Sequence, residues 1–172
     1  WFDDYMRWIW EISEKQSIEK IKAMSLIIKD YVLFYINKKN THPSIPANVS
    51  YNAVDDARIF QKYVWYGYEW VSKKWFDALA VTKNQIILYN NYVPILPYYN
   101  CSAGFTWSAQ EKYWWTDTPY LVSQLDFAKC DDFNWHGVWL SGEWAQKMAE
   151  SWKNYKDIIN YYYKWMTIKD LK

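Results

Sequence analysis

Glycine is scarce in this chain of 172 residues, which contains only 4 of them. Average usage of about 7% would give roughly 12. Tryptophan, ordinarily one of the rarest residues, occurs 14 times. Together the two residues number 18, which is an ordinary glycine allotment plus a few tryptophans. Because tight turns and helix ends favour glycine, the chain lacks the residue that usually makes them.

The chain also has no excess of charge of one sign, no long apolar run and no pattern of metal ligands. The net charge is +1, so nothing in the electrostatics favours binding to nucleic acid or to an anionic membrane. The densest apolar run, residues 31–36, is far shorter than a membrane span. Two cysteines and two distant histidines fit no metal pattern, and we expect neither a metal nor a cofactor. No signal peptide is visible, and a start at Trp1 predicts that a preceding segment was removed.

The apolar pattern predicts a single α+β domain over residues 1–172. Apolar residues three and four apart within residues 17–38 indicate an N-terminal helix, with Ser17 as its N-cap. In residues 78–99, β-rich runs alternate with turn residues such as Asn90-Asn91, which predicts a central antiparallel β-meander. The C-terminal part is expected to form two short helices and a final strand, over residues 142–151, 154–163 and 167–171.

Several tryptophans occupy positions where the backbone favours glycine. Trp152 and Trp165 follow the two expected C-terminal helices, where a left-handed residue commonly ends a helix. Trp135 and Trp139 bracket a His-Gly-Val stretch that reads as a tight loop, and Trp107 follows another turn-like stretch. A bulky residue with positive φ is costly. Aromatic packing in a core or a sugar cleft is the alternative explanation for these tryptophans.

Residues 135–165 resemble the C-terminal motif of the SpoIID/LytB family, which comprises stage II sporulation protein D and amidase enhancers. That motif contains Gly-His-Gly-Val-Gly, then Ser, Met-Ala and a Tyr-rich helix. The match requires tryptophan in place of the family's glycine at Trp135, Trp139, Trp144, Trp152 and Trp165.

The resemblance extends upstream through residues 101–121, 61–65 and 4–35 and so covers nearly the whole chain. In this alignment Trp114 falls on the family's tryptophan, whereas Trp115 and Trp8 fall on glycines. We therefore hypothesise that many of these tryptophans arise from decoding: UGA is read as glycine in some bacterial lineages and as tryptophan in other genetic codes.

The resemblance implies action on peptidoglycan glycan strands by a lytic transglycosylase mechanism, which can operate with one carboxyl group. Glu11 is the candidate, because it lies between Ile9 and Ile12 and eight residues before Glu19, as in the family motif. A surface carboxylate at a helix start is the alternative reading of Glu11. The family also contains amidase enhancers, so a non-catalytic module that binds glycan and stimulates a cell-wall amidase is the alternative function. Either implies a place outside the cytoplasm, at the cell envelope.

Four further residues in the family's loops are candidates for substrate contact. His136 is expected either to bind a sugar hydroxyl or to fix its loop by hydrogen bonds. Ser102, Thr106 and Ser141 are expected to bind glycan hydroxyls or to cap turns, with turn chemistry favoured for Thr106. Cys101 and Cys130 are expected either to form a disulfide or to remain two buried thiols. The sequence does not decide between these alternatives, because it does not give the geometry that a disulfide requires.

Overall fold

The computed structural model describes residues 2–9, 11–38, 42, 44–46, 48–49, 51, 53–56, 60–64, 72–130 and 137–171. Its helices are α1 (Phe2–Arg7), α2 (Ile18–Asn37), α3 (Lys73–Thr82), α4 (Ala109–Tyr113), α5 (Gly142–Glu150) and α6 (Tyr155–Tyr162). Its strands are β1 (Gln85–Leu88), β2 (Tyr98–Tyr99), β3 (Ala103–Thr106), β4 (Gln124–Lys129), β5 (Leu140–Ser141) and β6 (Thr167–Asp170). The α+β class is confirmed, as are the helix expected over residues 17–38, both C-terminal helices and the final strand.

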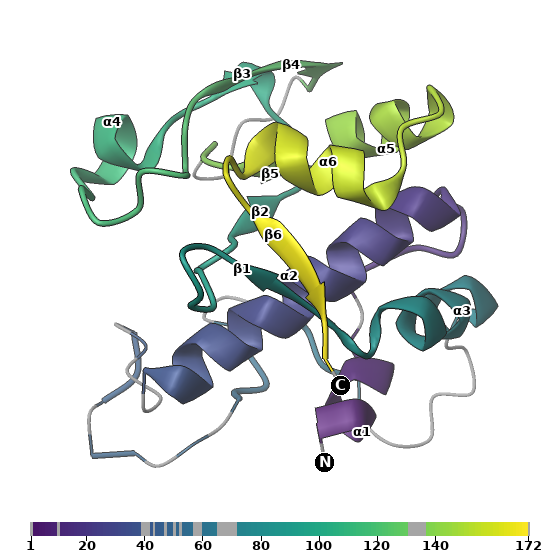
Figure 1. Cartoon of the computed structure of the whole chain (residues 1–172), viewed down its shortest axis with the longest axis vertical. Coiled ribbons are helices and arrows are strands. Elements are labelled where there is room, and N and C mark those ends of the chain that lie inside the picture. Colours follow the sequence, from purple (N-terminus) through teal and green to yellow (C-terminus); the bar gives the residue numbers. More distant parts are fainter. Residues whose placement is uncertain are drawn as a thin grey trace.

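Helix α2 is the centre of the core and runs through the middle of the molecule (Figure 1). Its side chains are buried on more than one face, and six apolar residues have no exposed surface: Ile21, Ala23, Leu26, Ile27, Ile28 and Val32. A helix that is apolar on several faces must be covered on several sides. Helices α3, α5 and α6 and strand β1 provide that cover. No helix in the described part of the chain is long and apolar enough to cross a membrane.

Residues 73–82 form helix α3, so the strand expected at Ala78–Val81 is wrong. Trp75, Ala78 and Thr82 are buried, and their spacing of three and four residues is that of one helical face. The Ser72 side chain accepts a hydrogen bond from the Trp75 N–H and caps the helix. A short apolar run does not by itself distinguish a strand from a buried helical stripe. Here the buried residues from Trp75 to Thr82, three and four positions apart, are those of a helix.

The strands form three two-stranded sheets rather than a central meander. Strand β1 pairs antiparallel with β6 from the end of the chain, and the pair crosses α2 (Figure 1). The tight turn expected at Asn90-Asn91 is present, with positive φ at both residues and a pair of backbone hydrogen bonds between Tyr89 and Tyr92. The next strand, β2, pairs parallel with β5. This pairing places Tyr98 beside Leu140, next to the His-Gly-Val stretch.

Candidate functional site

Glu11 lies between α1 and α2, against the segment that contains Lys62 and Tyr63. Ile9 forms an antiparallel bridge with Tyr63, and the Val64 N–H donates to the Trp8 carbonyl at 2.8 Å. Immediately after this bridge, the Lys62 N–H donates to Glu11 Oε1 at 2.5 Å. The backbone on both sides of the carboxyl group is therefore fixed by residues far away in the sequence.

Burial raises the pKa of Glu11 above its usual value, although the Lys62 N–H and the Lys62 charge oppose the shift. Loss of water favours the neutral form of a carboxyl group, and both contacts with Lys62 favour the charged form. The Glu11 charge in turn contributes to the raised pKa values of Tyr5 and Tyr98, for which burial is the larger cause. Glu11 is thus a half-buried carboxyl group next to buried phenols.

Gln61 holds this group of side chains together and is 1% exposed. The Tyr5 hydroxyl donates to Gln61 Oε1 at 2.9 Å, and Gln61 Nε2 donates to the Ile28 carbonyl of α2 at 3.2 Å. A hydrogen bond to Gln61 also lowers the pKa of Tyr98 against the effect of burial. One buried amide therefore connects α1, α2 and β2 behind Glu11.

Tyr5, Gln61 and Tyr98 were not predicted as site residues from the sequence. A signal for Gln61 was present, because residues 61–65 resemble the family's Gln-x-Tyr-x-Gly motif. Nothing local marks Tyr5 or Tyr98, which reach Glu11 only through tertiary packing.

His136 and Trp135 lie outside the described residues. The loop resumes at Gly137, which has a φ of 69° and whose carbonyl accepts a hydrogen bond from the Trp107 N–H at 2.9 Å. Val138 then forms a parallel bridge with Trp107. The role of His136 stays a prediction.

Ser102, Thr106 and Ser141 are all buried and hydrogen-bonded inside the protein. Ser102 Oγ accepts from the Gly104 N–H, and Thr106 Oγ1 accepts from the Gln124 N–H across the β3–β4 pair. Ser141 is the N-cap of α5. These bonds fit turn and cap chemistry, and sugar contacts by the three hydroxyls stay a prediction.

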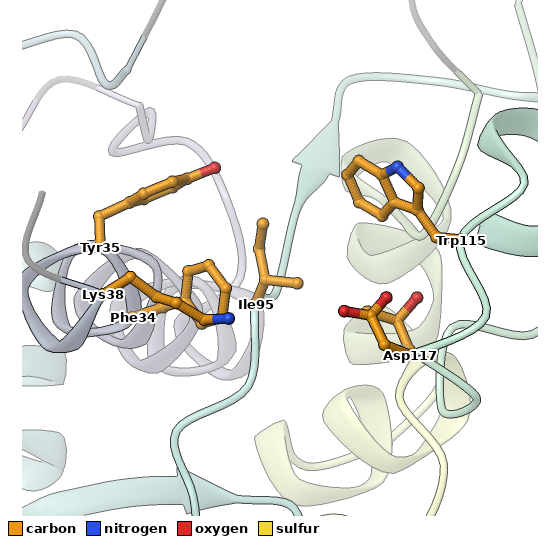
Figure 2. Close-up of a pocket in the computed structure, with 7 residues that line it drawn as sticks. Phe34, Tyr35, Lys38, Ile95, Trp115 and Asp117 are labelled. Carbon is orange, nitrogen blue, oxygen red and sulfur yellow. The ribbon is translucent and has the colours of Figure 1, made fainter. Parts of the chain in front are cut away.

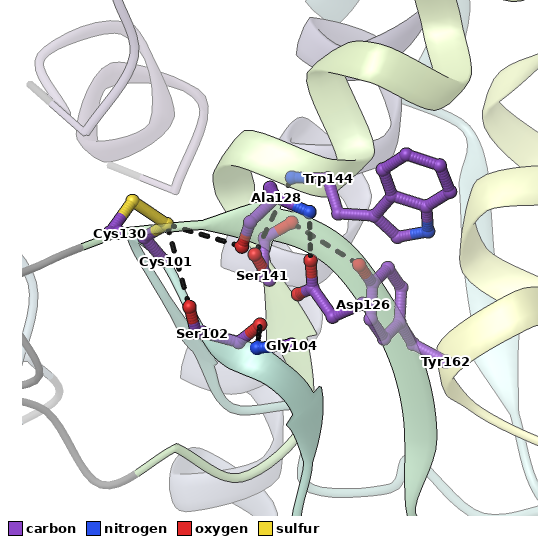
Figure 3. The surroundings of a disulfide bond; sticks show 9 residues. All are labelled: Cys101, Ser102, Gly104, Asp126, Ala128, Cys130, Ser141, Trp144 and Tyr162. Atoms are coloured by element: carbon purple, nitrogen blue, oxygen red, sulfur yellow. Dashed lines mark hydrogen bonds between the residues drawn. A yellow bond between two sulfur atoms is a disulfide. The ribbon is translucent and has the colours of Figure 1, made fainter.

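Cys101 and Cys130 form a disulfide, with their Cα atoms 6.0 Å apart. The bond joins the start of the β3 segment to the end of β4, and Ser102 and Ser141 lie beside it (Figure 3). Asp126 of β4 is 1% exposed and accepts from the Ala128 N–H at 2.9 Å. The disulfide and these hydrogen bonds brace β3 and β4 around the two serines. In the described part of the chain, no three His, Cys, Asp or Glu side chains group as metal ligands would.

No family model matches the chain. The chain is 32% identical to stage II sporulation protein D of Bacillus subtilis (strain 168) over 114 residues. The chain is related to stage II sporulation protein D. The match covers 61% of this chain and 32% of the relative, so the chain spans about a third of the length of stage II sporulation protein D.

Three tryptophans at expected glycine positions have a left-handed backbone. The φ angles are 80° at Trp139, 65° at Trp152 and 60° at Trp165. Trp152 follows the C-cap of α5, and the Lys153 N–H donates to the Met148 carbonyl, which is the hydrogen bond of a Schellman motif. This confirms the helix-end position expected for Trp152.

Other tryptophans do not follow this rule. The left-handed residue that ends α4 is Trp114, with a φ of 60°, whereas the alignment with the family places glycine at Trp115. Positive φ is also absent at several residues expected in glycine-like positions: Trp8, Trp107 and Trp144. The backbone conformation therefore favours glycine at some of these tryptophan positions and shows no preference for glycine at the others.

Proposed function

We propose that this chain cleaves peptidoglycan glycan strands as a lytic transglycosylase, with Glu11 as its one catalytic carboxyl group. The observation that carries the proposal is the raised pKa of the half-buried Glu11 beside buried tyrosines. A general acid must start protonated, and partial burial is the usual means of keeping a carboxyl group neutral. The relationship to stage II sporulation protein D supports a substrate in the cell wall.

The proposed reaction needs no second carboxylate and no water. The Glu11 carboxyl group gives its proton to the glycosidic oxygen as the bond from that oxygen to the muramyl C1 breaks. The resulting carboxylate then takes the proton of the muramyl 6-hydroxyl, whose oxygen bonds to C1 and closes a 1,6-anhydro ring. Glu11 ends the cycle protonated. Ordinary glycosidases use two carboxyl groups because water or an enzyme nucleophile replaces the internal hydroxyl.

A second candidate function is a non-catalytic module that binds glycan and stimulates a cell-wall amidase. One observation favours it: the Lys62 N–H already donates to Glu11 Oε1, and this bond stabilises the carboxylate over the acid. If this bond persists when glycan is bound, it favours the charged form of Glu11, which is a poor proton donor.

The test is the reaction of purified, peptide-stripped glycan strands with the wild type and with Glu11→Gln. We expect anhydromuramyl ends from the wild type and none from Glu11→Gln, while both proteins sediment with insoluble glycan. The control is Glu14→Gln, which alters an exposed carboxylate three residues away. Retained sedimentation without anhydro ends in the wild type would favour the binding module.

We also propose that the protein works outside the cytoplasm, at the cell envelope. The Cys101–Cys130 disulfide supports this location, because disulfides persist mainly in oxidising compartments.

We further propose that UGA codons specify the residues now read as Trp139, Trp152 and Trp165, and that the native residue is glycine. The positive φ angles at the three sites support this decoding. The coding DNA tests it, since UGG codons at these sites would exclude it.

A further inference from the structure

A cavity of about 290 Å³ lies between the end of α2 and the loop that follows α4. Figure 2 shows Phe34, Tyr35 and Lys38 on one side, Trp115 and Asp117 on the other, and Ile95 between them. This volume lies just below the range for small-molecule sites, about 300–1,000 Å³, and suits a ligand of one ring. None of these residues was predicted as part of a binding site from the sequence.

The cavity combines apolar walls with polar groups of complementary kinds. Phe34 and Tyr35 present aromatic rings, and the Lys38 ammonium lies 5.4 Å from the centre of the Phe34 ring. Asp117 is exposed and carries the opposite charge on the far wall. The site therefore offers a strong acceptor and a strong donor with no net charge.

Thr118 adds a buried hydroxyl to the lining of the cavity. Its side chain lines the cavity and is 8% exposed. Its hydroxyl oxygen has no hydrogen-bond partner among the described residues. Buried hydroxyls are nearly always satisfied, so this one is available to a ligand group once the side chain turns toward the cavity.

We propose that this cavity binds one pyranose ring of a glycan strand. A sugar ring has apolar C–H faces that fit between aromatic rings, and an edge where hydroxyl and acetamido groups both donate and accept. Asp117 accepts from hydroxyls, Lys38 donates to ring-substituent oxygens, and Thr118 can do both. The balanced charge of the cavity suits a neutral ligand. The inference rests on the proposed function, from which the glycan is taken.

A run of tyrosines packs between the cavity and the Glu11 site. The Tyr35 ring is 5.1 Å from that of Tyr31, and the phenols of Tyr5 and Tyr98 lie near enough to Tyr31 to interact electrostatically with it. Glu11 acts on these last two phenols.

The experiment is a calorimetric titration with the β-1,4-linked trimer of N-acetylglucosamine, in a Glu11→Gln background so that no bond is cleaved. Asp117→Asn and Lys38→Met are each expected to raise the Kd at least 5-fold. The matched controls are Asp170→Asn and Lys169→Met on the exposed strand β6, and these should leave the Kd unchanged. None of these four residues belongs to the core, so each variant is expected to fold.

The failures of the two proposals are distinguishable. An unchanged Kd in both cavity variants overturns the sugar site, even if anhydro ends form on glycan strands. Loss of trimer binding in both variants supports the site, even if Glu11→Gln still cleaves and the proposed catalyst is wrong. Binding of alanyl-alanine in preference to the trimer, with the same dependence on Asp117 and Lys38, would show that the site takes a zwitterion and would overturn the sugar assignment.

Discussion

Replacing Trp152 and Trp165 by glycine is expected to stabilise the protein. Both residues have positive φ, at 65° and 60°. A left-handed backbone costs an L-residue with a side chain roughly 1–2 kcal/mol. Glycine adopts the same backbone without that cost, although it has more freedom to lose on folding, which offsets about 0.5–1 kcal/mol.

Packing does not reverse this expectation, because the two side chains are 97% and 69% exposed. We therefore expect a gain of roughly 0.5–1 kcal/mol in the free energy of unfolding from each change. For a chain of this size, 1 kcal/mol corresponds to about 2–4 °C in Tm. The Trp152→Gly/Trp165→Gly double variant is thus expected to melt about 2–8 °C higher than the wild type.

Trp139 is expected to behave in the opposite way despite a φ of 80°. It is 4% exposed and stacks on Trp115 with the ring centres 5.8 Å apart. Removing a buried large aromatic side chain costs about 3–5 kcal/mol, which exceeds the relief of backbone strain. Trp139→Gly alone should therefore lower the Tm.

The assay is thermal and urea unfolding of each variant, with Trp152→Ala as the matched control. Alanine removes the same ring but keeps a Cβ at positive φ, so it should gain little. If Trp152→Gly is no more stable than Trp152→Ala, the positive φ at residue 152 does not destabilise the wild type. That result would refute the expected gain in stability.

Three further predictions concern the disulfide, a buried carboxyl group and the pH dependence of cleavage. Cys101→Ser should lower the free energy of unfolding by about 3–4 kcal/mol in oxidising buffer, as expected for a bridge between residues 29 positions apart; no loss would show that the bridge does not constrain the unfolded chain. Burial raises the pKa of Asp30 to about 7, so the folded state binds a proton more tightly than the unfolded state. Stability should therefore fall as pH rises from 3.8 to about 7, and Asp30→Asn, followed by urea unfolding, should flatten that slope. Formation of anhydro ends should decline as pH rises through the raised pKa of Glu11, because the acid form is required; a rate that keeps rising with pH would contradict this role.

Local sequence patterns were enough to predict three of the helices. Helix α2 and the C-terminal helices α5 and α6 follow the expected ranges closely. Helix α3 was not predicted, because residues 78–81 were assigned to a β-rich run and Trp75, the first buried residue of the helix, precedes that run. The meander was wrong for a different reason: β1 pairs with β6 from the far end of the chain, and no local pattern specifies that partner.

The candidate site was predictable only where a motif marks it. Glu11 was found through the spacing of a family motif, and the disulfide was one of two alternatives left open for Cys101 and Cys130. Tyr98 and the cavity residue Asp117 come together with α1 and α2 only in the folded chain, so their roles follow from tertiary packing.

The most direct test of the central claim is a mass measurement of the products formed from peptide-stripped glycan strands in ¹⁸O-labelled water. The proposed reaction at Glu11 uses the sugar's own 6-hydroxyl, so we expect 1,6-anhydromuramyl ends that carry no ¹⁸O. Reducing muramyl ends labelled with ¹⁸O would show that water is the nucleophile and would contradict the transglycosylase mechanism.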